Sequence, residues 1–258
     1  MNDKLLVETA VLAGEIMLVS GAEIFRVENT IDHILRKAGR ETAEAIVFST
    51  GIFASLNDPS IEAITVARRV PGRSTNLNRV FLVNDVSRRL CEDLLTVEEA
   101  YGKLKEIRNT MQYSGLLKDV GIVGVAVFFT LLLGGSGRDC LGAAVTGAVL
   151  AGTMELSVRF RLNDFCINGV CAFLIAVTAL FVERWLLPGV KSDIIIIGAI
   201  MPLVPGVIFT TAIRDTLNGD YASGTARMVE AIVVALAVAA GVGAGMGLFQ
   251  WLTGGVLW

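Results

Sequence analysis

The sequence predicts an α-helical polytopic membrane domain of about five transmembrane helices, residues 115–258, preceded by a soluble α+β domain, residues 1–114. Charge is the first observation: residues 1–118 hold 15 of the 22 Lys and Arg residues and 16 of the 25 Asp and Glu residues. Glycine shows the opposite trend, because 21 of 27 glycines lie after position 114. The third observation is a set of charge-free stretches, each of which marks one crossing of the bilayer: Val120–Gly137, Cys140–Met154, Phe165–Val182, Ile194–Ile213 and Ala231–Trp258.

The soluble domain is expected to contain helices packed on a small sheet. Apolar residues at helical spacing predict a first helix over residues 5–19 and a second over 22–38. Short runs rich in Ile, Val, Phe and Thr then predict three antiparallel strands, Ala45–Thr50, Ile52–Asn57 and Ile61–Arg68. A helical period returns over residues 77–95, and the sequence Thr96-Val97-Glu98-Glu99 predicts a capping box that opens a further helix.

Basic residues near a crossing hold that end of the helix in the cytoplasm. Because the N-terminal domain carries most of them, we expect it in the cytoplasm of a multi-pass protein of the cytoplasmic (inner) membrane. Loops 159–164 and 214–227 then lie inside as well, and the C-terminus lies outside.

Small residues recur four positions apart in the predicted spans, at Gly147/Ala151, Ala148/Gly152, Gly241/Gly245 and Gly243/Gly247. Such faces let helix backbones approach closely, either within this chain or against another protein. Many transporters are assembled from paired repeats, so an odd number of spans favours a second membrane protein as partner, in addition to lipid.

The fourth charge-free stretch contains Met201-Pro202-Leu203-Val204-Pro205-Gly206 in its middle. Each proline removes a backbone donor and clashes with the preceding turn, so the helix must kink or break. One interpretation is a kink that serves packing alone. The other is a discontinuous helix that forms a substrate site at the bilayer midplane. In that case the first amides of the following half-helix bind a carboxylate, and the candidate substrate-binding residues are Pro202, Pro205, Gly206, Val207, Arg214 and Asp215.

Ionisable residues in or beside spans are costly and often mark ion or proton pathways. Glu155 and Glu230 are therefore candidates for proton coupling, although Arg227 and Glu230, three residues apart, can also pair on one helix face. A second charge cluster, Glu23, Arg26 and Glu28, forms either a solvated helix face or a docking surface for the membrane domain.

Several classes of protein are disfavoured. The single His33 excludes a histidine-based metal cluster, and Cys91, Cys140, Cys166 and Cys171 lack the spacing of a metal site. Phosphate-binding and hydrolase motifs are missing, so we expect no cofactor and no enzymatic activity. The near-neutral charge balance gives no electrostatic reason to expect nucleic-acid binding.

Four segments resemble the threonine/serine exporter family. They are SGAEIFRVENTI, STGIFASLND, RVPGRSTNLNRVFLVNDVSRRL, and MPLVPG followed by AIRDTLNGD, which is the most specific. Larger members of that family carry a second, five-span module that this chain lacks. The chain is therefore similar to split members, in which a separate small membrane protein supplies the other half and the pair is implicated in dicarboxylate (succinate) export. The resemblance implies a proton-coupled exporter of small carboxylate metabolites.

Two other functions compete with export. One is a membrane-tethered enzyme that acts through the soluble domain, which lacks a recognisable nucleophile, base and orienting group. The other is a sensor or scaffold with a membrane anchor. A plain anchor would not require a helix broken by Pro-Leu-Val-Pro-Gly.

Overall fold

The computed structural model describes residues 2–70, 72, 74–110, 113–160 and 163–254. The chain forms two compact units: Met1–Met111 with Val207–Val229, and Gln112–Gly206 with Glu230–Trp258. The predicted boundary at residue 114 lies near the first of these breaks. Residues 207–229, which the sequence places in the membrane domain, instead pack with the N-terminal unit, because they share buried polar contacts with it.

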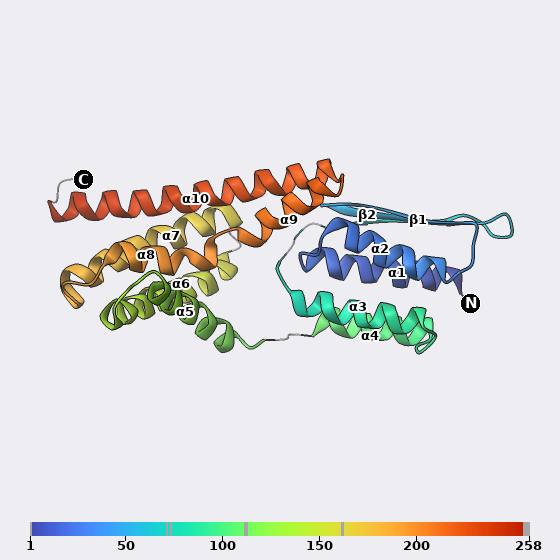
Figure 1. Ribbon diagram of the computed structural model, residues 1–258, viewed down its shortest axis with the longest axis horizontal. Coiled ribbons are helices and arrows are strands. Elements are labelled where there is room, and N and C mark those ends of the chain that lie inside the picture. The colour runs from blue at the N-terminus through green and yellow to red at the C-terminus, as the bar shows by residue number, and fades with distance from the viewer. Residues whose placement is uncertain (1, 71, 73, 111–112, 161–162, 255–258) are drawn as a thin grey trace. The chain divides into compact units, whose positions relative to one another are not determined.

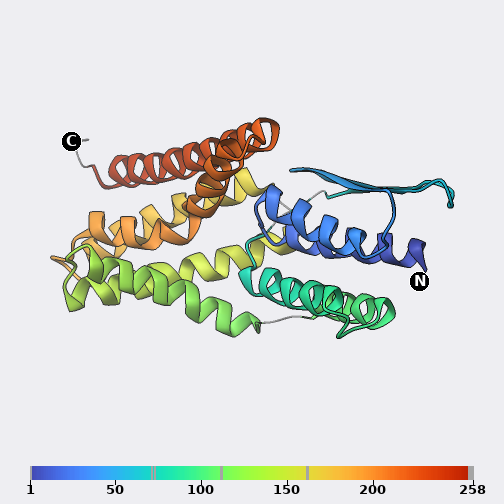
Figure 2. The same cartoon turned by 45° about the vertical axis from the view of Figure 1, so that its right-hand side comes forward.

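The first unit has three layers, a sheet and two helical pairs (Figure 1). One pair, α1 and α2, lies between the sheet and the second pair, α3 and α4, and a view rotated by 45° shows the same order (Figure 2). The elements are α1 (Asp3–Val19), α2 (Ile24–Arg36), β1 (Thr42–Phe48), β2 (Gly51–Asn57), β3 (Ile64–Arg69), α3 (Leu77–Cys91) and α4 (Val97–Asn109).

The sheet is an antiparallel meander of order β1-β2-β3, as the sequence predicts. Its inner face buries Val47, Ile52, Ala54 and Leu56 against the helices. Helix α1 packs closely on α2, since a Cβ at Gly14 would lie 2.5 Å from the Cδ1 atom of Ile31. The α+β prediction for this part of the chain is therefore confirmed.

The predicted capping box is also present at the start of α4. The Glu99 backbone N–H donates to the Thr96 hydroxyl at 3.2 Å, and the Thr96 N–H donates to the Glu99 carboxylate at 2.9 Å. Two amides that the helix cannot satisfy internally are thereby bonded.

The second unit is helical. Its elements are α5 (Gly115–Leu132), α6 (Gly137–Phe160), α7 (Asp164–Phe181), a π-helical turn η1 (Val182–Leu186), α8 (Ser192–Ile200), a 3-10 turn η2 (Met201–Leu203) and the larger part of α10 (Tyr221–Thr253). Helix α9 (Gly206–Leu217) and the first turns of α10 belong to the first unit.

Four helices in the described part of the chain are long and apolar enough to cross a membrane. They are α5, the first 21 residues of α6, α7 with η1, and α10. A fifth candidate is the interrupted pair Ser192–Leu203 and Gly206–Leu217. The chain is thus a multi-pass membrane protein with four to five spans, in agreement with the prediction.

Half of the predicted small-residue positions serve packing inside the second unit. A Cβ at Gly241 would lie 2.3 Å from the Gly169 carbonyl oxygen, and one at Gly245 would lie 2.7 Å from the Phe173 carbonyl oxygen. Helices α7 and α10 therefore approach so closely that only glycine fits. In contrast, a Cβ at Gly152, Gly243 or Gly247 would meet nothing within 4 Å.

Candidate functional site

The turn between α1 and α2 is a meeting point for distant parts of the first unit. Gly21 has φ +84°, a conformation that favours glycine, and it ends α1. Glu23 is the N-cap residue of α2 but makes no side-chain cap hydrogen bond. The first amides of α2 must therefore find acceptors elsewhere.

One acceptor comes from α9. The Oδ1 atom of Asp215 accepts a hydrogen bond from the Ile24 backbone N–H at 3.1 Å, so a carboxylate 191 residues away caps α2. This carboxylate also favours the positive end of the helix dipole.

A buried arginine completes this arrangement. The Nη1 atom of Arg227 lies 2.9 Å from Oδ2 of Asp215, and the two side chains are 3% and 0% exposed. The Nη2 atom of Arg227 donates to the Ala22 carbonyl oxygen at 3.1 Å. Together with a hydrogen bond from the Ser49 N–H to the Ser223 hydroxyl at 3.2 Å, these contacts fix residues 207–229 on the N-terminal unit.

Glu23 points to a different partner. Its Oε1 atom accepts a hydrogen bond from Arg214, and its Oε2 atom lies 4.0 Å from Nε of Arg26. The Glu23 side chain is only 12% exposed, whereas that of Arg214 is 67% exposed. The solvated-face interpretation is thus wrong for Glu23, and it holds for Arg26, which is 54% exposed.

A cavity of about 150 Å³ lies beside this ion pair, within the first unit. It is bounded by the α1–α2 turn, the start of α3 and one face of α9. Its lining consists of Gly21, Ala22, Glu23, Arg26, Leu77, Val80, Val207, Thr210, Thr211 and Arg214. Two of the predicted substrate-binding residues, Val207 and Arg214, therefore line a real cavity, whereas Asp215 is fully buried behind it.

The proline-rich stretch interrupts the helix as predicted. Helix α8 ends at Ile200, a 3-10 turn includes Pro202, and Val204 is extended with φ −67° and ψ 126°. Helix α9 then starts at Gly206, directly after Pro205. The backbone at Gly206 is open, since an added Cβ would meet nothing within 4 Å.

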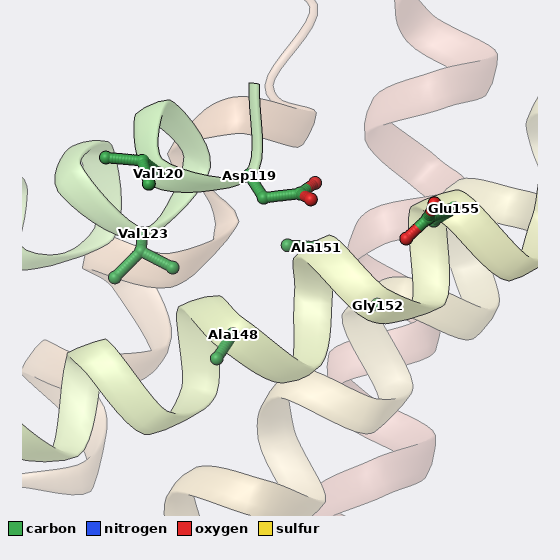
Figure 3. Close-up of a pocket in the computed structure, with 7 residues that line it drawn as sticks. All are labelled: Asp119, Val120, Val123, Ala148, Ala151, Gly152 and Glu155. Carbon is green, nitrogen blue, oxygen red and sulfur yellow. The ribbon is translucent and has the colours of Figure 1, made fainter. Parts of the chain in front are cut away.

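The first candidate for proton coupling, Glu155, lies in the second unit at a cavity of about 320 Å³ between α5 and α6. Figure 3 shows its carboxylate and that of Asp119 on the same side of this cavity, with Ala151 and Gly152 between the two residues. The second candidate, Glu230, is half-buried on α10. Arg227, three residues before Glu230 on the same helix, binds Asp215.

Three carboxylates of the first unit have raised pKa values: Glu28 and Asp32 on α2, and Asp220 between α9 and α10. Burial raises the pKa of Glu28, the Val47 N–H at 2.9 Å partly opposes this shift, and the charges of Asp220 and Asp32 add to it. Burial likewise raises the pKa values of Asp32 and Asp220, with Arg227 opposing the shift at Asp220. These groups favour their neutral forms more than exposed carboxylates do.

The sequence marked Arg227 only as a charged residue beside a span and Glu23 only as part of a helical charge cluster, and it did not identify Asp119. Glu23 accepts a hydrogen bond from Arg214, 191 residues away, and Arg227 donates to the carbonyl of Ala22, 205 residues away, which no local spacing can show. Asp119 precedes the charge-free stretch at Val120, so the search for charges within the spans missed it.

Comparison with known proteins identifies the family of this chain. A family model described as "Putative threonine/serine exporter" matches residues 8–249. A Mycobacterium tuberculosis protein named "Probable threonine/serine exporter" is 23% identical over 237 residues, which cover 90% of this chain and 44% of that protein. An uncharacterised protein of Schizosaccharomyces pombe is 25% identical over 187 residues, or 69% of this chain and 22% of that protein. This chain thus spans less than half the length of the curated relatives it matches. No solved structure matches it.

Proposed function

Because this chain belongs to the threonine/serine exporter family, we propose that it is one subunit of a secondary exporter. Its substrates are small carboxylate metabolites, either threonine and serine or succinate-like dicarboxylates. The exporter is coupled to protons. The N-terminal domain lies in the cytoplasm, so substrate reaches the protein from that side.

The break between α8 and α9 is the observation that carries this proposal. An interrupted helix at membrane depth persists where it lines a cavity or is buried in protein. The Gly206 amide donates to the Val204 carbonyl oxygen at 2.8 Å. By helix geometry the next amides of α9 have no partner within their own helix, and they carry the positive end of its dipole. A carboxylate suits that position, as phosphate suits helix N-termini elsewhere.

The predicted substrate residues take distinct roles in this mechanism. Pro202 and Pro205 keep the helix interrupted, and Gly206 lets the substrate approach the backbone, since nothing occupies the space beside it. Val207 and Arg214 line a cavity of the first unit, where Arg214 attracts the anion. Asp215 acts indirectly by holding α9 against the start of α2.

Proton coupling is assigned to carboxylates of the second unit. Glu155 shares its cavity with a second carboxylate, that of Asp119. Glu230 on α10 is the other candidate. Protonation would neutralise these carboxylates and so lower the free-energy cost of exposing them to lipid.

A second membrane protein supplies the rest of the transporter in this proposal. The Mycobacterium tuberculosis relative is more than twice as long as the segment that matches this chain, so it holds further sequence of unassigned role. The open small-residue positions Gly243 and Gly247 on α10 offer a surface for helices of such a partner.

Export from vesicles tests the proposal. The purified chain is reconstituted with labelled threonine, serine or succinate inside, with and without a co-expressed membrane protein similar to the remaining part of the relative. We expect saturable efflux that requires the partner and is accelerated by a proton gradient. Efflux at the rate of empty vesicles under every condition would contradict the proposed transport, and full efflux from this chain alone would contradict the subunit role.

A further inference from the structure

The cavity of the first unit is lined by one largely buried negative charge and two exposed positive charges. Glu23 forms part of its wall and is 12% exposed. Arg214 and Arg26 lie at the rim with exposed side chains. Below these charges, the lining is apolar except for the hydroxyl groups of Thr210 and Thr211.

The two threonine hydroxyls are already partly used. Each donates a hydrogen bond to the Val207 carbonyl oxygen within α9, at 3.1 Å for Thr210. A hydroxyl that donates its proton still has lone pairs for accepting a hydrogen bond. The cavity therefore offers acceptors and charges of both signs to a small ligand.

We propose that this cavity binds the head group of a zwitterionic α-amino acid, with Glu23 as the residue that selects its ammonium group. The inference rests on the proposed export function and assigns a residue-level site to it. The substrate ammonium takes the place of Arg214 on the Glu23 carboxylate, and the released guanidinium binds the substrate carboxylate. One ion pair is exchanged for two, so no buried charge is left without a counter-charge.

The exposed position of Arg214 makes this exchange feasible. Its side chain is 67% exposed, and within the described residues it pairs with Glu23. Arg26, with Nε 4.0 Å from Glu23, can assist in neutralising the substrate carboxylate. The backbone around Glu23 stays in place, because Asp215 and Arg227 bind the adjacent Ile24 and Ala22.

The same geometry discriminates between the substrate classes of the exporter. A dicarboxylate would place its second negative charge near the carboxylate of Glu23, and two like charges at short range repel each other in a site with little water. A hydroxy acid without an ammonium group would leave the Glu23–Arg214 pair unbroken. The cavity, at about 150 Å³, is smaller than the roughly 300–1,000 Å³ typical of sites for drug-sized ligands. It therefore suits a small amino acid.

Binding to the purified full-length chain in detergent tests the assignment. Labelled threonine is the probe, and the competitors are serine, succinate and 3-hydroxybutyrate, which is threonine without its amino group. We expect threonine and serine to bind at least about tenfold more tightly than the other two, because each of these lacks one charge-assisted contact. Glu23→Gln should reduce this discrimination to within about twofold. The variant loses the contact with the ammonium group of threonine, so threonine binds more weakly, and it no longer repels the second carboxylate of succinate.

Two further variants make the result specific. Glu15→Gln changes a glutamate that lies 3.8 Å from Arg68 outside the cavity, and should leave every affinity unchanged. Arg214→Gln should weaken the binding of threonine more than that of 3-hydroxybutyrate, since only an ammonium group releases Arg214 from Glu23 to bind a carboxylate. Unchanged discrimination in Glu23→Gln, or no saturable threonine binding by the wild-type chain, would overturn the proposal.

Vesicle export separates this inference from the proposed function. If the wild-type protein exports threonine and Glu23→Gln exports it with unchanged substrate preference, the site is wrong while the transport function stands. If threonine binds with the expected dependence on Glu23 but is never transported, the binding site stands and the transport function fails.

Discussion

The buried pair of Asp215 and Arg227 provides the most direct test of how the first unit is assembled. The substitution Asp215→Asn keeps an oxygen that can accept from the Ile24 N–H, but it removes the negative charge 2.9 Å from Arg227. Arg227 then retains its bond to the Ala22 carbonyl but loses this counter-charge in a site that is 3% exposed.

The expected loss in the free energy of unfolding is large. Removing one partner of a buried ion pair typically costs about 3–5 kcal/mol, because the other charge stays buried. At about 2–4 °C per kcal/mol for chains of 150–250 residues, the midpoint of thermal unfolding should fall by roughly 10 °C. The double variant Asp215→Asn/Arg227→Gln removes both charges, so its loss of stability should be smaller than the sum of the two single losses by about 0.5–3 kcal/mol.

The assay is thermal unfolding in detergent, followed by circular dichroism, for the wild type, both single variants and the double variant. Asp85→Asn is the matched control, because Asp85 pairs with Arg89 at 3.7 Å on an exposed surface, where such pairs contribute about 0–1 kcal/mol. If Asp215→Asn shifts the midpoint no more than Asp85→Asn does, or if the two single losses add fully in the double variant, the buried pair does not hold the unit together.

Three further outcomes are expected. Gly206→Val should fold normally, because nothing lies within 4 Å of the added Cβ, and should lose most export in the vesicle assay; normal export would leave the break as a packing feature alone. Gly241→Val should lower thermal stability by about 1–3 kcal/mol through overpacking, since its Cβ would lie 2.3 Å from the Gly169 carbonyl oxygen, whereas Gly243→Val, with open space, should not. Glu28 has a pKa raised above its ordinary value of 4.5 by burial, so the folded state holds its proton more tightly and stability falls as pH rises above that value. In thermal melts recorded from pH 4 upward, Glu28→Gln should therefore lose less stability with rising pH than the wild type. An unchanged dependence of the unfolding midpoint on pH would exclude Glu28 as the cause.

Several features of this protein follow from the sequence alone, because they depend on short-range patterns. Short runs rich in Ile, Val, Phe and Thr, separated by Gly51 and Pro59, predict the three strands. The capping box at Thr96 and Glu99 is a local hydrogen-bonding motif, so its four residues are sufficient to predict it. The interruption before Gly206 follows from the missing amide protons of two prolines.

The small-residue positions show that local sequence patterns do not predict which helix face packs against a neighbour. Spacing identifies Gly241/Gly245 and Gly243/Gly247 equally well, yet only the first pair packs against α7. Which face of a helix meets a neighbour depends on how the helix is rotated in the bundle. That rotation depends on all the contacts of the helix together, and no four-residue pattern encodes it.

The composition of the charged site is decided by tertiary structure. The sequence shows Glu23, Arg26, Arg214, Asp215 and Arg227 as separate local charges, and helical spacing suggests a partner only for Glu23 and Arg26, with each other, and for Arg227, with Glu230. In the folded chain, Asp215 caps a helix 191 residues away, and Arg227 binds a carbonyl 205 residues away. Buried charges must be paired, but the sequence does not say with which partner. The folded backbone makes that choice, because only it sets which opposite charges and unsatisfied amides lie within hydrogen-bonding distance.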